Sequence, residues 1–252
     1  MYIRMVANWK IIGACAQGLR HLEEGTACQD KIYSLCENDV AVIALADGAG
    51  SAAQSDLGAE TAVQALCEKF CQGFDEIINT ENLLDAKKII LDFILMRLEN
   101  KSQELGCDVH ELASTLLGAA CKGENVLIIH IGDGMIACFK DSRTLLISSP
   151  NNGEFVNETF FTTTDNALQK MKLARTKLES IEGFALMSDG ADNSFYNRAD
   201  KKFVDLLKEI HDDCVTYSEQ ENNPDLQDLM ESIIRYNTSD DCGLIIMSRA
   251  SN

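Results

Sequence analysis

The sequence predicts an α+β fold built on antiparallel sheets, and three observations support this. Two long segments with apolar residues at helical spacing follow the first buried strand. The middle of the chain is instead a series of short apolar runs separated by tight turns, as in antiparallel strands. A further helix near the end leads into a last strand. Helices grouped between runs of strands favour α+β over an alternating, parallel arrangement.

The first part of the chain contains one clear strand and two clear helices. Residues 40–46 (VAVIALA) are a continuous apolar run that stops at Asp47-Gly48, which indicates a buried strand entering a tight turn. Residues 56–72 and 83–105 each place apolar side chains three and four positions apart. That spacing predicts two amphipathic helices.

The rest of the chain is a run of short strands that gives way to helices. The predicted strands are residues 113–121, 126–131, 135–139, 144–148, 184–188 and 244–247. Apolar spacing predicts a helix around residues 203–210. The last helix is expected to begin at Asn223, a good N-cap, with Pro224 at the first helical position.

Length and charge limit the function classes. The chain of 252 residues contains two prolines and has no linker-like segment, so we expect residues 1–252 to form a single domain. It carries 22 basic and 40 acidic residues, a net charge of −18. A surface this acidic repels phosphate backbones and anionic lipids, which argues against nucleic-acid binding and against a membrane surface.

The cysteines indicate a reducing compartment. There are ten, none is in a C-x-x-C pair, and several lie inside apolar runs. The N-terminal residues lack a signal-peptide pattern, and no run approaches the ~18 apolar residues of a membrane span. We therefore expect reduced thiols and a cytoplasmic protein.

Aspartates recur at the ends of the predicted strands, usually next to glycine. Asp47, Asp133 and Asp189 follow predicted strands, the pair Asp240-Asp241 comes just before one, and Asp30 precedes Lys31-Ile32-Tyr33. Asp-Gly is also a common turn dipeptide, so any one of them could be an ordinary turn. If the strands pair side by side, however, their ends gather several like charges that need a counter-charge. Mg²⁺ or Mn²⁺ suits such all-oxygen ligation better than zinc does.

These residues resemble the type 2C (PPM) metal-dependent protein phosphatases, and more closely their compact bacterial branch. The matching segments are GTACQD (25–30), DGAGS (47–51), AST (113–115), IGDG (131–134), SDGAD (188–192) and DDCG (240–243). Residues 153–157 followed by 159–162 also look like that branch, and residues 154–162 form either a flap beside the cleft or an ordinary loop. Each segment alone is weak, but six in family order across nearly the whole chain are specific.

The resemblance implies a four-layer α-β-β-α sandwich of two antiparallel sheets flanked by helices, with two Mn²⁺ or Mg²⁺ ions, and possible space for a third, at one end. Asp47, Asp30, Asp189 and Asp240 would be the catalytic residues. The metal ligands carried over are Asp47 bridging both ions, the Gly48 carbonyl on the first, Asp30, Asp189 and Asp240 on the second, and Asp133 and Asp192 on a weaker third site. Asp241 replaces the family's usual asparagine, so either Asp240 or Asp241 could be the ligand.

The implied activity is hydrolysis of phosphoserine and phosphothreonine on proteins. A water bridging the two ions would attack phosphorus in line. The chain has no cysteine-phosphatase loop, which agrees with a mechanism without a covalent intermediate. The implied partners are phosphorylated proteins and a cognate serine/threonine kinase or its targets.

Two positions depart from the family pattern. Ala49 stands where many members have a histidine that could act as general acid, and Gly25 stands where the phosphate-binding arginine is expected. Arg20 and His21 are candidates for that phosphate-binding role. His21 matches a histidine of the bacterial branch, but it could equally be a surface or capping residue.

Two other functions stay open at this stage. Ala49 and Gly25 are compatible with a weak or inactive phosphatase-like module that binds phosphoproteins or a kinase. A phosphatase of the haloacid-dehalogenase type would need Asp-x-Asp after the first strand, which Asp47-Gly48-Ala49 lacks. Among the histidines, His110 and His211 are expected in solvent because their surroundings are polar.

Overall fold

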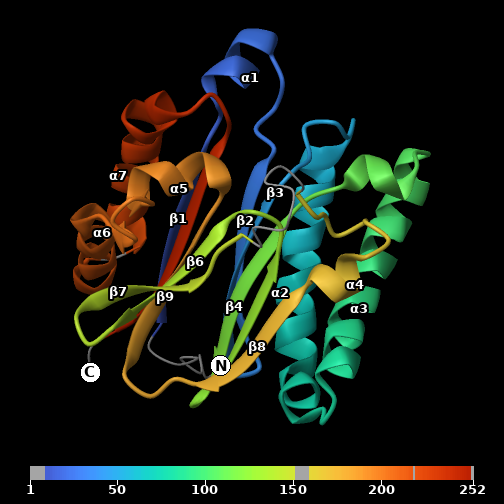
Figure 1. Cartoon of the computed structure of the whole chain (residues 1–252), viewed down its shortest axis with the longest axis horizontal. Helices are drawn as coiled ribbons and strands as arrows, with labels where there is room; N and C mark the ends of the chain where they lie inside the picture. The colour runs from blue at the N-terminus through green and yellow to red at the C-terminus, as the bar shows by residue number, and fades with distance from the viewer. Residues whose placement is uncertain (1–8, 151–158, 218, 251–252) are drawn as a thin grey trace.

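The structure, a computed structural model, describes residues 9–150, 159–217 and 219–250. Of the segment predicted as a flap or loop, 154–162, only residues 159–162 lie within the described part. Two five-stranded antiparallel sheets stack against each other, and helices cover both outer faces (Figure 1). This confirms the α+β, four-layer α-β-β-α sandwich.

Each sheet combines strands from distant parts of the chain. The first contains, in spatial order, β1 (Trp9–Ala16), β12 (Cys242–Arg249), β9 (Ile181–Met187), β6 (Met135–Lys140) and β7 (Arg143–Ser148). The second contains β2 (Asp30–Glu37), β3 (Val40–Asp47), β4 (Leu116–Lys122), β5 (Asn125–Ile131) and β8 (Lys172–Lys177). All neighbouring strands within each sheet run antiparallel, so the chain ends and the middle of the sequence meet in the first sheet.

The helices divide between the two sheets (Figure 1). The second sheet packs against α2 (Ser55–Asn79) and α3 (Leu83–Leu105). The first packs against α5 (Asp189–Phe195), α6 (Asp205–Thr216) and α7 (Glu219–Ser232). The smaller elements are α1 (Leu19–Glu24), α4 (Ala167–Lys170), the hairpin of β10 (Tyr196–Asn197) and β11 (Lys202–Phe203), and two 3₁₀ turns, Val109–Leu112 and Ile234–Asn237.

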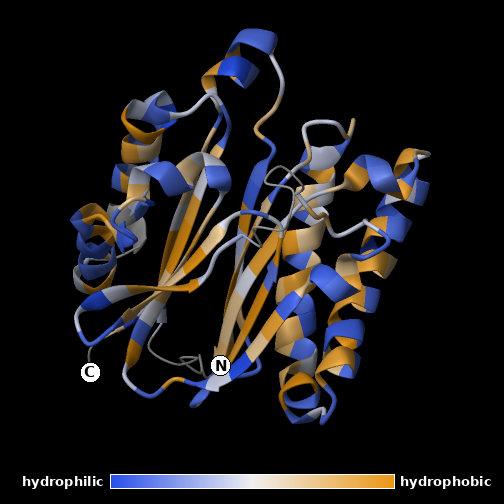
Figure 2. Cartoon of the chain, viewed as in Figure 1, coloured by the Kyte–Doolittle hydropathy of each residue, from blue (hydrophilic) through white to orange (hydrophobic). Residues whose placement is uncertain are grey.

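Strand β3 shows why a continuous apolar run becomes a strand here. Val42 and Ala44 pack toward the α2–α3 layer, whereas Ile43 and Leu45 pack between the two sheets. Successive side chains of a strand point to opposite faces, and both faces of β3 are covered. Figure 2 shows the hydrophobic residues gathered on the strands and on the helix sides turned toward them.

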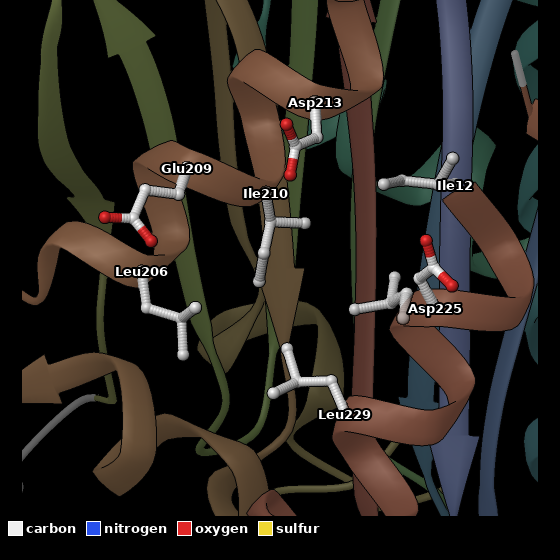
Figure 3. Close-up of a pocket in the computed structure, with 8 residues that line it drawn as sticks. Ile12, Leu206, Glu209, Ile210, Asp213, Asp225 and Leu229 are labelled. Carbon is white, nitrogen blue, oxygen red and sulfur yellow. The ribbon is translucent and has the colours of Figure 1, made fainter. Parts of the chain in front are cut away.

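The α6–α7 layer encloses a cavity of about 160 Å³. Apolar side chains such as Ile12, Ile210 and Leu229 line it, and the carboxylates of Glu209 and Asp225 lie around it (Figure 3). None of the predicted metal ligands lines this cavity. It is therefore a packing gap of the outer helices, separate from the candidate site.

Two sequence expectations were wrong. The last helix begins at Glu219, so Pro224 lies inside it rather than at its first position, and the Asn223 side chain accepts a hydrogen bond from the Gly13 N–H (3.1 Å). His211 is buried, because its ring stacks on Phe139 at 4.0 Å between centroids. His110, in contrast, is exposed as expected.

Among the described residues, no helix combines the length and the apolar character needed to cross a membrane.

Candidate metal centre

The centre is built around two aspartates on neighbouring strands. Asp30 begins β2 and Asp47 ends β3, and the antiparallel register places them directly opposite each other. Asp30 is almost fully buried. Directly opposed like charges destabilise a sheet, so this pair needs a neutralising group.

The backbone around Asp47 is held on both sides. Its N–H donates to the Thr115 Oγ1 (2.9 Å), and its carbonyl accepts from the Thr115 N–H (2.8 Å). The Gly48 N–H donates to the Gln29 carbonyl (3.2 Å), and Gly48 forms an isolated bridge with Ser114. The position of the Asp47 side chain is therefore set by backbone pairing with β2 and with the start of β4.

Two further aspartates reach the same place from strand ends. Asp133 follows β5, and Asp189 follows β9 as the first residue of α5. Carboxylate oxygens of Asp47, Asp133 and Asp189 lie within 4.8 Å of one another. These residues come from both sheets, so stacking of the sheets brings the three carboxylates together.

Ser188 connects Asp30 to the other sheet. Its Oγ donates to the Asp30 Oδ2 (2.6 Å) and accepts from the Gly243 N–H (2.8 Å). The second oxygen of Asp30, Oδ1, is buried without a hydrogen-bond partner. A buried carboxylate oxygen without a partner is costly, and a bound cation would satisfy it.

The electrostatics reflect crowded negative charge. Burial, with the charges of Asp241 and Asp189 adding to it, raises the pKa of Asp30 to about 8. Burial and the neighbouring Asp30 and Asp189 raise the pKa of Asp47 well above its usual range. Burial together with Asp133 and Asp240 raises the pKa of Asp189 to about 6. Each carboxylate is thus harder to ionise because the others are there.

The donor set fits hard divalent cations. Among the described residues, Asp30, Asp47, Asp133 and Asp189 form no ion pair with a lysine, arginine or histidine. The donors are all oxygens, as Mg²⁺ and Mn²⁺ prefer. A cation would replace the protons that the raised pKa values keep on Asp30 and Asp47.

Asp240 and Asp241 have different surroundings. Asp241 is buried and its two oxygens accept from the Gly18 and Gln29 N–H groups, both at 2.6 Å. Asp240 is only half-buried, and its charge contributes to the raised pKa of Asp47 and of Asp189. Both carboxylate oxygens of Asp241 therefore already have hydrogen-bond donors from the protein, whereas the charge of Asp240 acts on the carboxylate cluster.

The residues predicted for a third metal site are partly engaged by the protein. Asp192 is buried, and its Oδ2 accepts from Arg198 (2.6 Å) while Oδ1 has no hydrogen-bond partner. Burial raises the pKa of Asp192 to about 6, against the lowering effect of Arg198. Asp133 accepts a hydrogen bond from the Thr159 hydroxyl.

The candidate phosphate-binding residues lie beside this centre. His21 is buried, and its Nδ1 is 3.0 Å from Asp241. Its Nε2 is 3.3 Å from the exposed Arg20 guanidinium, so a short chain of contacts joins Arg20 to the Asp240-Asp241 segment. His21 is therefore not a surface residue. Gly25 ends α1 with a φ of +69°, a conformation that disfavours the arginine found there in the family.

Sequence reasoning missed three supporting residues. Ser188 and Thr159 were noted only as parts of segments that resemble the family, with no role assigned, and Arg198 was not singled out. Residues 113–115, one of the segments that resemble the family, lie beside the metal aspartates, since Thr115 forms hydrogen bonds with Asp47. Ser188, which directly precedes Asp189-Gly190, and Thr159, at the start of residues 159–162, could have been found from those segments, whereas Arg198 lies outside them.

Solved structures with this fold include several phosphatases. The serine/threonine phosphatase of S. agalactiae superposes with a TM-score of 0.61 at 20% identity, covering 95% of this chain and 99% of that one. The catalytic domain of the serine threonine protein phosphatase PstP, solved with two manganese ions, gives a TM-score of 0.64 at 15% identity, covering 96% of this chain and 99% of that one. These likenesses show the fold, a two-sheet sandwich shared with metal-dependent phosphatases.

The sequence comparisons are more specific. The model of the protein phosphatase 2C family matches residues 17–231. Serine/threonine-protein phosphatase 3 of Escherichia coli strain K12 is 25% identical over 209 residues, which are 77% of this chain and 78% of that protein. The chain belongs to the protein phosphatase 2C family. The alternative of a haloacid-dehalogenase-type phosphatase is therefore wrong.

Proposed function

We propose that this chain removes phosphate from phosphoserine and phosphothreonine in proteins, using two Mn²⁺ or Mg²⁺ ions. The observation that carries the proposal is the convergence of Asp47, Asp133 and Asp189, with Asp30 directly opposite Asp47 on the neighbouring strand; none of the four has a basic partner among the described residues. Membership of the protein phosphatase 2C family and the phosphatase relative from Escherichia coli support the same activity.

We assign Asp47 as the ligand shared by both ions, with the Gly48 carbonyl beside it. Asp30, Asp189 and Asp240 would complete the second position. Asp240 is chosen over Asp241 because the latter is already occupied by two N–H groups and His21. Asp133 and Asp192 would contribute to a weaker third position, for which Asp192 must share its charge with Arg198.

Ions bound there would lower the pKa of a coordinated water and neutralise charge that develops on the phosphoryl oxygens. The chain would position these ions by holding the backbone of the ligand residues in place, as the two hydrogen bonds between Asp47 and Thr115 illustrate. Ala49 is buried and offers no acid to the leaving group. Arg20, held against His21, is the candidate cation for the substrate phosphate.

The biological setting is also part of the proposal. We infer that residues 1–252 act as one catalytic domain, because the ligands come from both sheets. None of the ten cysteines forms a disulfide, which suits a reducing cytoplasm. The expected partners are phosphorylated proteins, including a cognate kinase or its targets. We assign no role with nucleic acid or membranes to a chain of net charge −18.

The test is phosphate release from p-nitrophenyl phosphate and from a phosphothreonine peptide, with Mn²⁺ and with EDTA. The Asp47→Asn variant is the control. Turnover that requires Mn²⁺ and that the variant lacks is the expected result. Mn²⁺ binding without any turnover would overturn the proposal and favour a module that binds phosphoproteins or a kinase.

A further inference from the structure

A groove of positive charge lies on this acidic chain. It runs between β7, the β10–β11 hairpin and the start of α6, with a volume of about 420 Å³. Four basic residues line it, namely Arg143, Lys201, Lys202 and Lys208, against one acidic residue, Asp205. The chain as a whole has almost twice as many acidic as basic residues, so this local excess is a reversal of the general pattern.

Three of these four cations are available to a ligand. Lys208 pairs with Asp212 one helical turn away. Arg143, Lys201 and Lys202 are exposed, and none of them forms an ion pair within the described part of the chain. The groove floor includes the rings of Tyr196 and Phe203, whose centroids are 4.8 Å apart. The groove can therefore contact a ligand through both positive charge and apolar surface.

The strand beside this groove has an open edge. β7 is the last strand of its sheet and pairs only with β6 among the described strands. Three consecutive apolar residues of this strand are 37–38% exposed, namely Leu145, Leu146 and Ile147. The edge strand β8 of the other sheet instead carries the charged residues Lys172, Arg175 and Lys177, which is how edges are usually protected from pairing. β7 has one charged residue, Arg143, at its first position, and the three exposed apolar residues along the rest of the strand lack that protection.

β7 also points toward the metal centre. Its last residue, Ser148, pairs in register with Ile136, whose other neighbour is Leu186 of β9. The Ser148 Oγ is 2.7 Å from His130, and the other nitrogen of that ring is 2.9 Å from the Gly132 carbonyl, next to Asp133. The Arg143 end is thus remote and the Ser148 end adjoins the centre, with roughly 17 Å of strand between them.

We propose that an extended acidic segment of the phosphoprotein substrate pairs with the open edge of β7 and places its carboxylates in the basic groove. This rests on the proposed phosphatase function. An extended polypeptide fits because a strand edge offers alternating N–H and C=O groups. An acidic one fits because Arg143, Lys201 and Lys202 form no ion pair among the described residues and outnumber the one acidic residue of the groove. The length of β7 places the acidic residues about five to seven positions from the phosphoresidue.

The substrates for the test are two phosphothreonine peptides of equal length. The two peptides, one with aspartates and one with glutamines five to seven positions from the phosphothreonine, are made in two versions, first with these residues on the N-terminal side and then with them on the C-terminal side, four peptides in all. The variant is Lys201→Glu with Lys202→Glu. Its matched control is Lys87→Glu with Lys88→Glu on α3, which makes the same charge change in the helix layer over the other sheet. Arg143→Glu is an independent second variant.

We expect the unmodified protein to prefer the acidic peptide by roughly ten-fold in kcat/KM, mainly through KM, and to lose this preference in high salt. The Lys201/Lys202 variant and Arg143→Glu should lose the preference, and the Lys87/Lys88 variant should keep it. All should hydrolyse p-nitrophenyl phosphate within about two-fold of the unmodified rate. Equal use of both peptides by the unmodified protein would overturn the proposal, as would a preference that survives Lys201→Glu/Lys202→Glu.

Binding separates this proposal from the phosphatase activity. Fluorescence anisotropy of a labelled, unphosphorylated acidic peptide needs no turnover, so it tests the groove even if p-nitrophenyl phosphate is not hydrolysed. N-methylation of alternate amides of that peptide should weaken binding in one register and not in the other. Equal binding of both N-methylated forms would rule out strand pairing, and absent binding of the parent peptide would rule out the site.

Discussion

Two sets of buried carboxylates lie next to each other in this protein and differ in what neutralises them. Asp241 has two N–H donors and His21, and Asp192 has Arg198. Asp30 and Asp47 face each other across a β-ladder, and within the described residues no basic side chain approaches them within ion-pair distance. The first set is completed by the protein. The charge of the second set can be neutralised only by a bound cation or by protons, which is why it is the candidate for binding cations.

The strongest test of this comparison is Asp47→Asn. We expect phosphate release to fall at least about 10³-fold, because the shared ligand of both ions would be lost. The metal-free variant should be as stable as the unmodified protein or more so, since one repelling charge opposite Asp30 is removed. Enzyme kinetics with Mn²⁺ and thermal unfolding in EDTA measure the two effects. A destabilised variant would place Asp47 in the first set instead.

The second test compares the same substitution at two adjacent residues, Asp240 and Asp241. Asp240→Asn should lower Mn²⁺ affinity at least about 100-fold, since outer-shell changes alone cost 10–100-fold, and it should leave the metal-free fold intact. Asp241→Asn should instead cost about 2–4 kcal/mol of unfolding free energy, because an amide NH₂ would face the Gly18 or Gln29 N–H. Calorimetric titration and chemical denaturation distinguish them. A loss of Mn²⁺ affinity for Asp241→Asn and a loss of stability for Asp240→Asn would make Asp241 the ligand instead.

The third test uses pH. In the folded, metal-free protein Asp30, with a pKa of about 8, holds a proton that the unfolded chain has released near pH 4. Where the folded state binds more protons, stability falls as pH rises, so unfolding free energy should drop by about 1 kcal/mol between pH 7 and 8 in EDTA.

Two kinds of group also act in that pH window. The pKa of Asp47 is raised like that of Asp30, so its retained proton adds to the fall in stability. Burial lowers the pKa of His130 to about 4, and that of His211 also falls, so both are already neutral in the folded state above pH 7 and oppose the trend only through the protons that the unfolded chain still holds. Saturating Mn²⁺ should reverse the trend, because binding displaces the protons. Asp30→Asn should flatten the pH dependence, and a metal-free protein that gains stability over this window would contradict the comparison.

The smallest effect is expected for Arg198→Ala, which removes the counter-charge of Asp192. Arg198 is half exposed, so the loss should be about 1 kcal/mol at pH 8. It should shrink at pH 5, where Asp192, with a pKa of about 6, takes up a proton. Denaturation at both pH values measures this, and an equal loss at both would mean that Arg198 acts through packing alone.

Much of the fold could be predicted because many of its strands and helices have strong local patterns of apolar residues. The run at residues 40–46 and the helix at 83–105 have nearly the boundaries that the patterns predict. Strand β2 and strand β8 were missed because their side chains are half exposed and mixed in polarity. The start of α7 was misplaced since Asn223 looks like a cap locally, while tertiary structure uses it to accept the Gly13 N–H.

The candidate site was predictable in part for a similar reason. Asp-Gly at strand ends marks Asp47, Asp133 and Asp189 without knowledge of the topology. What distinguishes Asp240 from Asp241 depends on Gly18 and Gln29, more than two hundred positions away. No local pattern carries that information, because it arises only when β1 and β12 are paired and the two sheets are stacked.

The Ser188 hydroxyl, which links Asp30 in one sheet to the Gly243 N–H in the other, has a consequence for how the protein matures. Asp30 and Asp240 are separated by most of the chain, so neither half alone can assemble the ion-binding pocket. Docking of the sheets involves contacts of large sequence separation, which form slowly. Manganese uptake during refolding should therefore lag behind the recovery of circular dichroism, and the newly made enzyme would stay inactive until its last long-range contacts have formed.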